Sequence, residues 1–370
     1  MVMSSDAPTP TGRTSTGPVP AGQVPTIPAP TSLVPGGQVI PGLGGMVPGA
    51  DALPDVLPTD RLGLRGKPRP PWRDDLRRIP NTRNALSVVW LVTMAVGVLW
   101  LAAWVANPVG YALAFVAEGC LIVRFNILGH EAVHRLLFSG KRLNDWVGRW
   151  VLSYPAFVAF DLYRRGHMAH HRDELGPNEP DLALYAGYPI SRDSMRRKLV
   201  RDAVGISGWK ILKGLFRGLR KPHSRPVALR IFGAQLGIVV VLAALGRPEL
   251  YLLSFGPYMT QWRVTNRLRA IAEHGGMERS PDRRRTTHHV RQSLVARVFM
   301  VPYNVGYHLA HHVDMGVPCW NLKALERELE ASGWVTDGYV HPNYRSLRRA
   351  LSSRPPSPAS PASSTAPLSA

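Results

Sequence analysis

The sequence is poor in cysteine and in acidic residues. Its two cysteines, Cys120 and Cys319, can build neither a disulfide framework nor a zinc site of CxxC pairs. Only 25 Asp and Glu oppose 45 Lys and Arg, which leaves a formal charge of +20 over 370 residues. No nucleic-acid-binding motif accompanies this charge, so we predict no nucleic-acid partner.

Aromatic residues are absent from the first part of the chain. Residues 1–60 contain no Phe, Trp or Tyr and are rich in Pro, Gly, Ser and Thr, so they predict a disordered tail. They also lack the apolar core of a secretory signal. Residues 352–370, rich in Pro and Ser, predict a second disordered tail. Residues 61–84 are a basic segment that precedes the first apolar run.

The region 85–351 contains long runs that lack charge or nearly so, and these predict an all-α, multi-pass membrane protein. A bilayer-spanning helix needs about 20 apolar residues. Residues 146–160 are apolar but short and contain Pro155, so we expect a re-entrant or interfacial segment. The four predicted spans cover residues 85–106, 109–128, 227–246 and 249–266.

The distribution of positive charge predicts the orientation of these spans. The turns near Asn107 and Arg247 have almost no Lys or Arg, whereas residues 161–227 contain fourteen and residues 263–297 contain nine. Positive residues are retained on the cytoplasmic side, so both loops and both tails should be cytosolic. A basic surface beside anionic lipid headgroups is sufficient to explain the +20.

Thirteen histidines are the most informative residues, and eight of them form three boxes. The boxes have ligand spacing and should all lie on the cytosolic side, in a helical cap. His274, in "RAIAEHGG", is a ninth candidate just beyond the fourth span. His223, His288, His289 and His341 stand outside the boxes and are expected to be structural. The three boxes are His130 with His134, then His167, His170 and His171, then His308, His311 and His312.

The spacing within the boxes favours a site for two metal ions. Residues three or four apart share a helical face, whereas adjacent residues diverge by about 100°. The pairs 170/171 and 311/312 are therefore poorly placed for one ion and well placed for two neighbouring ions. Imidazole binds Fe, Cu, Ni and Zn alike, but two irons could share the electrons needed to activate O₂, which zinc cannot do.

One short motif suggests a different enzyme. Residues 130–134, "HEAVH", match the HExxH pattern of zinc peptidases, in which a glutamate such as Glu131 is the general base. A membrane zinc peptidase needs one further ligand, however, and not two HxxHH boxes. We therefore expect Glu131 to orient a histidine or to lie on the surface. Four other carboxylates have the same two possible roles, with pairing to a nearby Arg favoured for each: Asp161, Asp181, Glu273 and Asp314.

Together, the boxes and their surroundings resemble the membrane fatty acid desaturase and hydroxylase superfamily. The resemblance runs from about Leu86 to Leu351 and includes "GHEAVHRLLF", "HMAHHRDELGPNEPDLALY", "AEHGG" and "NVGYHLAHHVDMGVPCWNL". It implies a di-iron centre, O₂ as co-substrate and an electron-transfer partner. It also implies that the iron ligands are His130, His134, His167, His170, His171, His274, His308, His311 and His312.

The same resemblance implies the reaction and the partners. The expected activity is desaturation of a lipid acyl chain in a membrane, which the composition suggests is bacterial. "HPNY" at 341–344 is not the HPGG haem signature of fused desaturases, so electrons should come from a separate donor. Ferredoxin, rubredoxin or cytochrome b5 with its reductase would serve. Alternatives are a lipid or carotenoid hydroxylase or ketolase, the zinc peptidase, and a non-catalytic protein that senses or stores metal.

Overall fold

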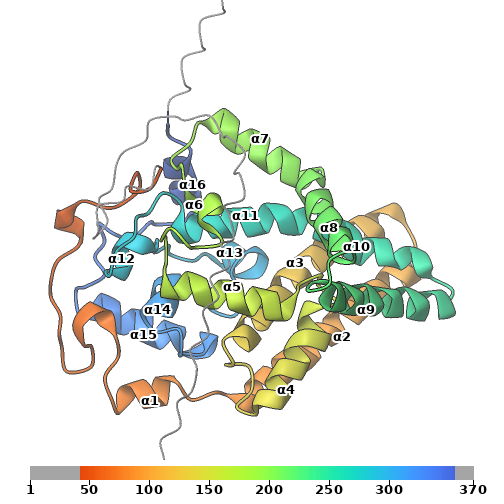
Figure 1. Cartoon of the computed structure of the whole chain (residues 1–370), viewed down its shortest axis with the longest axis horizontal. Coiled ribbons are helices and arrows are strands. Elements are labelled where there is room, and N and C mark those ends of the chain that lie inside the picture. The colour runs from red at the N-terminus through yellow and green to blue at the C-terminus, as the bar shows by residue number, and fades with distance from the viewer. Residues whose placement is uncertain (1–41, 355–370) are drawn as a thin grey trace, which may run out of the picture.

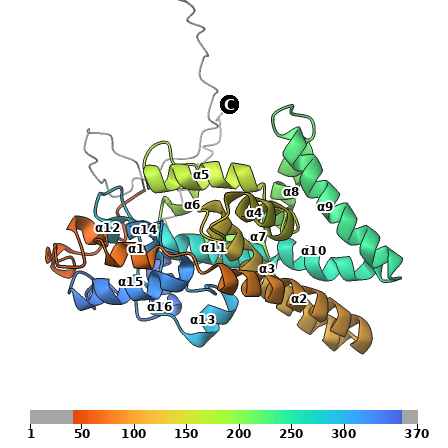
Figure 2. The same ribbon diagram turned by 90° about the horizontal axis from the view of Figure 1, so that it is seen from below.

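The computed structural model describes residues 42–354, and these form helices joined by loops, without a β-strand. Apolar helices gather at one end of the molecule and histidine-bearing helices at the other (Figures 1 and 2). The apolar end contains α2 (Asn81–Val105), α3 (Pro108–Val133), η3 (Val147–Ser153), α9 (Arg225–Ala244), η4 (Pro248–Leu250) and α10 (Tyr251–Met259).

The other helices cover the inner ends of α2 and α3 or connect the two ends. Among them, α5, α11 and α14 carry predicted histidines, as the end of α3 does, and α15 packs against α14. They are η1 (Ala50–Ala52), η2 (Leu64–Gly66), α1 (Trp72–Leu76), α4 (Lys141–Trp146), α5 (Phe160–Arg172), α6 (Leu182–Tyr185), α7 (Arg192–Ala203), α8 (Ile206–Gly218), α11 (Gln261–His274), α12 (Arg283–Thr286), α13 (Leu294–Phe299), α14 (His308–Val313), α15 (Cys319–Ala331) and α16 (Tyr344–Leu351).

In the part of the chain that the structure describes, three helices are long and apolar enough to cross a membrane. They are α2 extended back to Trp72, α3, and α9. The tight turn between α2 and α3 follows from its sequence, because Ala106 adopts the left-handed conformation and Asn107 caps α3. The Asn107 side chain accepts a hydrogen bond of 2.8 Å from the Gly110 N–H, and Pro108 occupies the first helical position.

The fourth predicted span, 249–266, is not one helix, so the count of four spans is not confirmed. Helix α10 ends at Met259, and α11 begins at Gln261 after Thr260, whose φ of −123° and ψ of −81° are not helical. Pro257 lies in the last turn of α10 and lacks the N–H that would extend the helix hydrogen bonds. The break lets α11 carry His274 into the histidine-bearing end.

The prediction of a disordered tail is wrong for residues 42–60. Leu43 is buried, and the backbone N–H groups of Gly44 and Met46 donate to the carbonyls of Met277 and Gly276. These residues are held by distant parts of the chain, which composition alone does not reveal. Ser352 is likewise buried after α16. The rest of the two predicted tails, 1–41 and 355–370, lies outside the described residues.

Candidate metal centre

Four helices bring the nine predicted histidines together. Box one is at the end of α3, box two lies along α5, His274 ends α11, and box three lies on α14. Helix α14 has only six residues and is held by packing, because Leu309, Ala310 and Val313 are buried against α15. Its histidines therefore face the opposite way, toward α5 and α11. Every one of the nine side chains is buried or half-buried.

The nine histidines form two clusters, which we call A and B. Five of them make cluster A: His130, His134, His167, His171 and His311. Three more lie together as cluster B, namely His170, His274 and His312. His308 joins cluster B, because its Nε2 atom lies 3.0 Å from Nε2 of His274 and 3.0 Å from Nε2 of His312.

The adjacent histidines of boxes two and three divide between the clusters. His170 belongs to B and His171 to A, while His312 belongs to B and His311 to A. This is the divergence expected of neighbouring residues on a helix. The two clusters are also in contact, since the rings of His171 and His312 stack with centroids 4.5 Å apart.

The nitrogen distances fit metal coordination. In cluster A the Nε2 atom of His167 lies 2.8 Å from that of His130, 2.9 Å from that of His134 and 3.1 Å from that of His171. Two ligand atoms about 2.1 Å from one ion and at right angles to each other are about 3.0 Å apart. Several imidazole nitrogens at this separation cannot all satisfy one another with the protons of neutral rings. The arrangement therefore suits a cation at each cluster.

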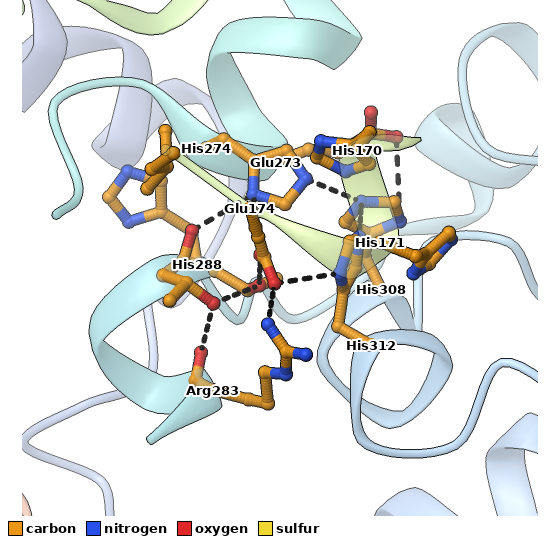
Figure 3. Close-up of polar contacts among 12 residues, drawn as sticks. His170, His171, Glu174, Glu273, His274, Arg283, His288, His308 and His312 are labelled. Carbon is orange, nitrogen blue, oxygen red and sulfur yellow. Dashed lines mark hydrogen bonds and ion pairs between the residues drawn. The ribbon is translucent and has the colours of Figure 1, made fainter. Parts of the chain in front are cut away.

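Two carboxylates that we did not predict support cluster B. Glu174 Oε1 lies 3.2 Å from Nδ1 of His274, and its Oε2 lies 3.1 Å from Nδ1 of His312 (Figure 3). Glu179 Oε1 lies 2.5 Å from Nδ1 of His170. The Nδ1–H of His274 also donates to the Thr286 carbonyl oxygen, at 2.9 Å. An acceptor at Nδ1–H leaves Nε2 without a proton and pointing at the metal. Both glutamates follow box two closely in "HRDELGPNEP", which is the only sequence signal for them.

Burial and charge set the protonation of this region. Burial and the neighbouring histidines lower the pKa values of His171, His308 and His312 well below the usual value, so these rings are neutral and can bind a metal. Burial alone would raise the pKa of Glu174, but bonding to His274 and the charges of His274 and Arg283 hold it at about 2. Arg283 and the Thr287 hydroxyl both contact this carboxylate.

The carboxylates proposed from the sequence have mixed roles. Glu273 lies 3.9 Å from His308 Nδ1 and also accepts a hydrogen bond from Arg269. Asp161 and Asp314 take the alternative role, because each forms a paired hydrogen bond with an arginine, Arg149 and Arg77 respectively. Asp181 has its pKa raised by burial.

Glu131, the residue that suggested a peptidase, accepts a hydrogen bond of 2.9 Å from the Cys319 N–H. It therefore joins the end of α3 to the start of α15, and its Oε1 lies 3.8 Å from Nδ1 of His130.

The four other histidines lie apart from both clusters. His288 Nε2 lies 2.9 Å from the Gly275 carbonyl oxygen, which fits a structural role. His289 contacts Glu326 through Nδ1, at 3.1 Å, and stacks on Tyr339. His341 is half-buried and pairs through its backbone with His289, while His223 is exposed.

Comparison with known proteins settles the family. The sequence pattern of the fatty acid desaturase family matches residues 100–342. The chain belongs to the fatty acid desaturase family. It is therefore an oxidoreductase of a membrane-associated family, as the resemblance predicted.

Two relatives show how far the similarity extends. Dihydrorhizobitoxine desaturase of Bradyrhizobium elkanii is 25% identical over 244 residues, which cover 61% of this chain and 69% of the relative. The sn-1 oleoyl-lipid 12-desaturase of Anabaena variabilis is 22% identical over 300 residues, covering 73% and 80% respectively.

Proposed function

We propose that this desaturase family member introduces a carbon–carbon double bond into a lipid acyl chain at a di-iron centre. O₂ is the oxidant, and two electrons come from a separate carrier of the ferredoxin, rubredoxin or cytochrome b5 type. The balanced reaction takes two hydrogens from adjacent CH₂ groups, and with O₂, two electrons and two protons it yields a double bond and two waters. The observation that carries the proposal is the division of adjacent histidines between clusters A and B.

The residues of the chain have separable roles in this proposal. Clusters A and B would hold one iron each, and the irons would supply the oxidising power for an unactivated C–H bond. Glu174 would orient the rings of His274 and His312, and Glu179 that of His170, so that Nε2 of these three rings is free of its proton. Phe157, Tyr258 and His130 line a pocket of about 280 Å³, through which an acyl chain would reach the centre.

The proposed orientation follows the distribution of charge. The Lys- and Arg-rich segments 161–227 and 263–297 contribute α5, α11 and α12 to the histidine-bearing end, whereas the turns at Asn107 and Arg247 lie at the far ends of the apolar helices. We therefore propose a bacterial cytoplasmic membrane with the metal centre and both tails on the cytosolic side. Such placement gives a soluble electron carrier direct access to the centre.

The first test is the metal content of the purified, detergent-solubilised protein. We expect about two irons per chain, and a loss of iron in His170→Ala because this ring belongs to cluster B. His223→Ala, a variant of an exposed histidine outside both clusters, is the matched control and should keep both irons. One zinc per chain that survives in His170→Ala but is lost in His134→Ala would contradict the di-iron proposal and favour the peptidase.

The second test is product analysis after supplying the protein with membrane lipids, a reduced carrier and O₂. A new double bond is the expected outcome, and no product should form without O₂. A hydroxylated or ketone product would assign the chain to the other activities of the superfamily. Full metal loading with no oxygen-dependent product from any acyl lipid would contradict the proposed activity.

A further inference from the structure

Three neighbouring spaces with shared lining residues lie between the apolar surface and the metal centre. We name them the outer groove, of about 840 Å³ between α2 and α9, the inner cavity, of about 390 Å³, and the metal-side pocket beside His130. Leu99, Trp150 and Pro155 line both the groove and the inner cavity. Phe157 and Tyr258, stacked with centroids 4.4 Å apart, line both the inner cavity and the metal-side pocket.

The inner cavity is lined mainly by apolar side chains. Polar side chains from α3, α9 and α10 reach it, and two of them satisfy each other. Gln235 donates through Nε2 to the carbonyls of Tyr154 and Pro155, and its Oε1 accepts from the Tyr251 hydroxyl at 2.9 Å. The hydrogen-bonding capacity of Gln235 is thus largely used within the protein, and it holds α9 to α10.

Glu118 differs from this pair because it retains an unused oxygen. It lies near the middle of α3, is only 3% exposed, and has the Ser254 hydroxyl as its hydrogen-bonding neighbour. Within residues 42–354, its Oε1 has no hydrogen-bond partner. A carboxyl group within a membrane-spanning helix is costly and usually faces a functional cavity. Ser254 offers one hydroxyl and cannot serve both carboxyl oxygens.

The surroundings of Glu118 indicate what kind of partner would fit. The cavity lining contains no Lys, Arg or His among the described residues. Burial of an ion pair between Glu118 and a cationic ligand would require the desolvation of both charges. A neutral hydrogen-bond donor surrounded by hydrocarbon avoids this cost and satisfies Oε1. A hydroxyl group on an aliphatic chain has this chemistry.

We propose that the inner cavity binds the part of the substrate's acyl chain beyond the metal-side pocket, and that Glu118 receives a hydrogen bond from a hydroxyl group on this part. The inference rests on the proposed function, because it takes the acyl chain as the occupant of the cavity. It makes Glu118 a specificity-determining residue that selects hydroxylated chains over plain ones.

The test is a binding experiment on the full-length, metal-loaded protein in detergent. Stearic acid and its monohydroxy derivatives, with the hydroxyl at successive carbons from mid-chain to the methyl end, displace a fluorescent fatty acid. We expect at least one derivative to bind about tenfold more tightly than stearic acid, as one well-placed hydrogen bond allows. The preference should vanish in Glu118→Leu and should fall but persist in Glu118→Gln, whose amide oxygen still accepts.

Leu99→Ala is the matched control, because Leu99 lines the same cavity with no polar group and should weaken the binding of both ligands equally. The inference is overturned if no derivative binds more tightly than stearic acid, or if the preference survives in Glu118→Leu. If Glu118→Leu does not fold, the inference is still tested by the ligand series on the wild type and by the reduced hydroxyl preference expected of Glu118→Gln. The displacement experiment requires no turnover, so it tests the hydroxyl preference separately from the desaturation reaction. A protein that prefers hydroxylated chains but forms no desaturated product would contradict the proposed function and leave this inference intact.

Discussion

At the scale of single residues, the histidine boxes predicted which rings lie together, whereas the carboxylates beside them were missed. Box spacing is a local property of a helix, and the divergence of adjacent histidines follows directly from helical geometry. Glu174 contacts His274 and His312, which are far from it in the sequence, so its role depends on how α5, α11 and α14 meet. A glutamate near a box has no spacing rule that would distinguish it from a surface residue.

Glu174→Gln should disable cluster B without unfolding the protein. The amide nitrogen of Gln cannot accept an Nδ1–H, so only one of the two rings can keep an oxygen of residue 174 as acceptor. His274 retains the Thr286 carbonyl at 2.9 Å, so we expect the loss of orientation at His312. We expect the affinity for metal to fall about 10–100-fold, with a similar loss of activity. Iron retention during chelator titration measures the first effect.

Asp173→Asn is the control for this variant, since the neighbouring carboxylate loses the same charge but contacts Arg279 rather than a histidine. It should retain iron as the wild type does. Equal iron retention by Glu174→Gln and Asp173→Asn would mean that Glu174 does not orient the cluster.

At the scale of elements, apolar runs predicted α2, α3 and α9 closely, because a long uncharged helix is specified by its own composition. The break at Thr260 was not predicted, although Pro257 is visible in the sequence. A proline near a helix end is compatible with a straight, kinked or broken helix, and the packing of α11 decides between them. We also did not predict that residues 42–60 are ordered, because their structure depends on contacts with distant residues such as Met277.

Substitution of Glu131 tests the junction of α3 with α15. Glu131→Gln retains an acceptor for the Cys319 N–H, so activity should stay within a few-fold of the wild type. Glu131→Ala leaves this buried donor unpaired and should lower the free energy of unfolding by about 1–3 kcal/mol. Thermal unfolding and oxygen-dependent turnover check the two expectations. Abolished oxygen-dependent turnover in a stably folded Glu131→Gln would contradict the first expectation and would mean that this carboxylate acts on the metal centre through His130.

A second junction, between α4, α5 and the end of α3, should be sensitive to acid. Arg164 donates to the carbonyls of Ala132 and Val133 and pairs with Asp145 at 2.7 Å. Burial raises the pKa of Asp145, but the hydrogen bonds and charge of Arg164 outweigh it and lower the pKa to about 2. A lowered pKa contributes stability above the unfolded-state value near 4, and this contribution disappears as the pH falls toward 2.

Asp145→Asn should therefore lower the unfolding temperature by about 2–4 °C at pH 7. The difference from the wild type should shrink between about pH 4 and pH 2, where the wild-type carboxylate becomes protonated. Unfolding followed by intrinsic fluorescence across this range is the measurement. A difference that is constant with pH would assign the effect to packing rather than to charge.

At the scale of the whole molecule, the charge of +20 has a predicted kinetic effect. The basic segments 161–227 and 263–297 contribute to the histidine-bearing end, where the proposed electron carrier would dock. An acidic carrier would then be attracted over long range, and salt would screen the attraction. We expect the apparent second-order rate of electron transfer to fall about tenfold or more between low and physiological ionic strength. Stopped-flow reduction with an acidic ferredoxin measures this, and a rate independent of salt would contradict it.

The paired histidines of α5 and α14 have a consequence for how the protein would acquire its irons. His170 and His171 are fixed to one helix, as are His311 and His312, and each pair contributes to both clusters. The first ion to bind would therefore fix the positions of both helices. The ligands of the second ion would then already be in place. Iron uptake should follow a sigmoidal isotherm, and a half-supplied preparation should contain chiefly fully loaded and empty molecules. Activity would then rise in proportion to the loaded fraction, with few inactive one-iron molecules.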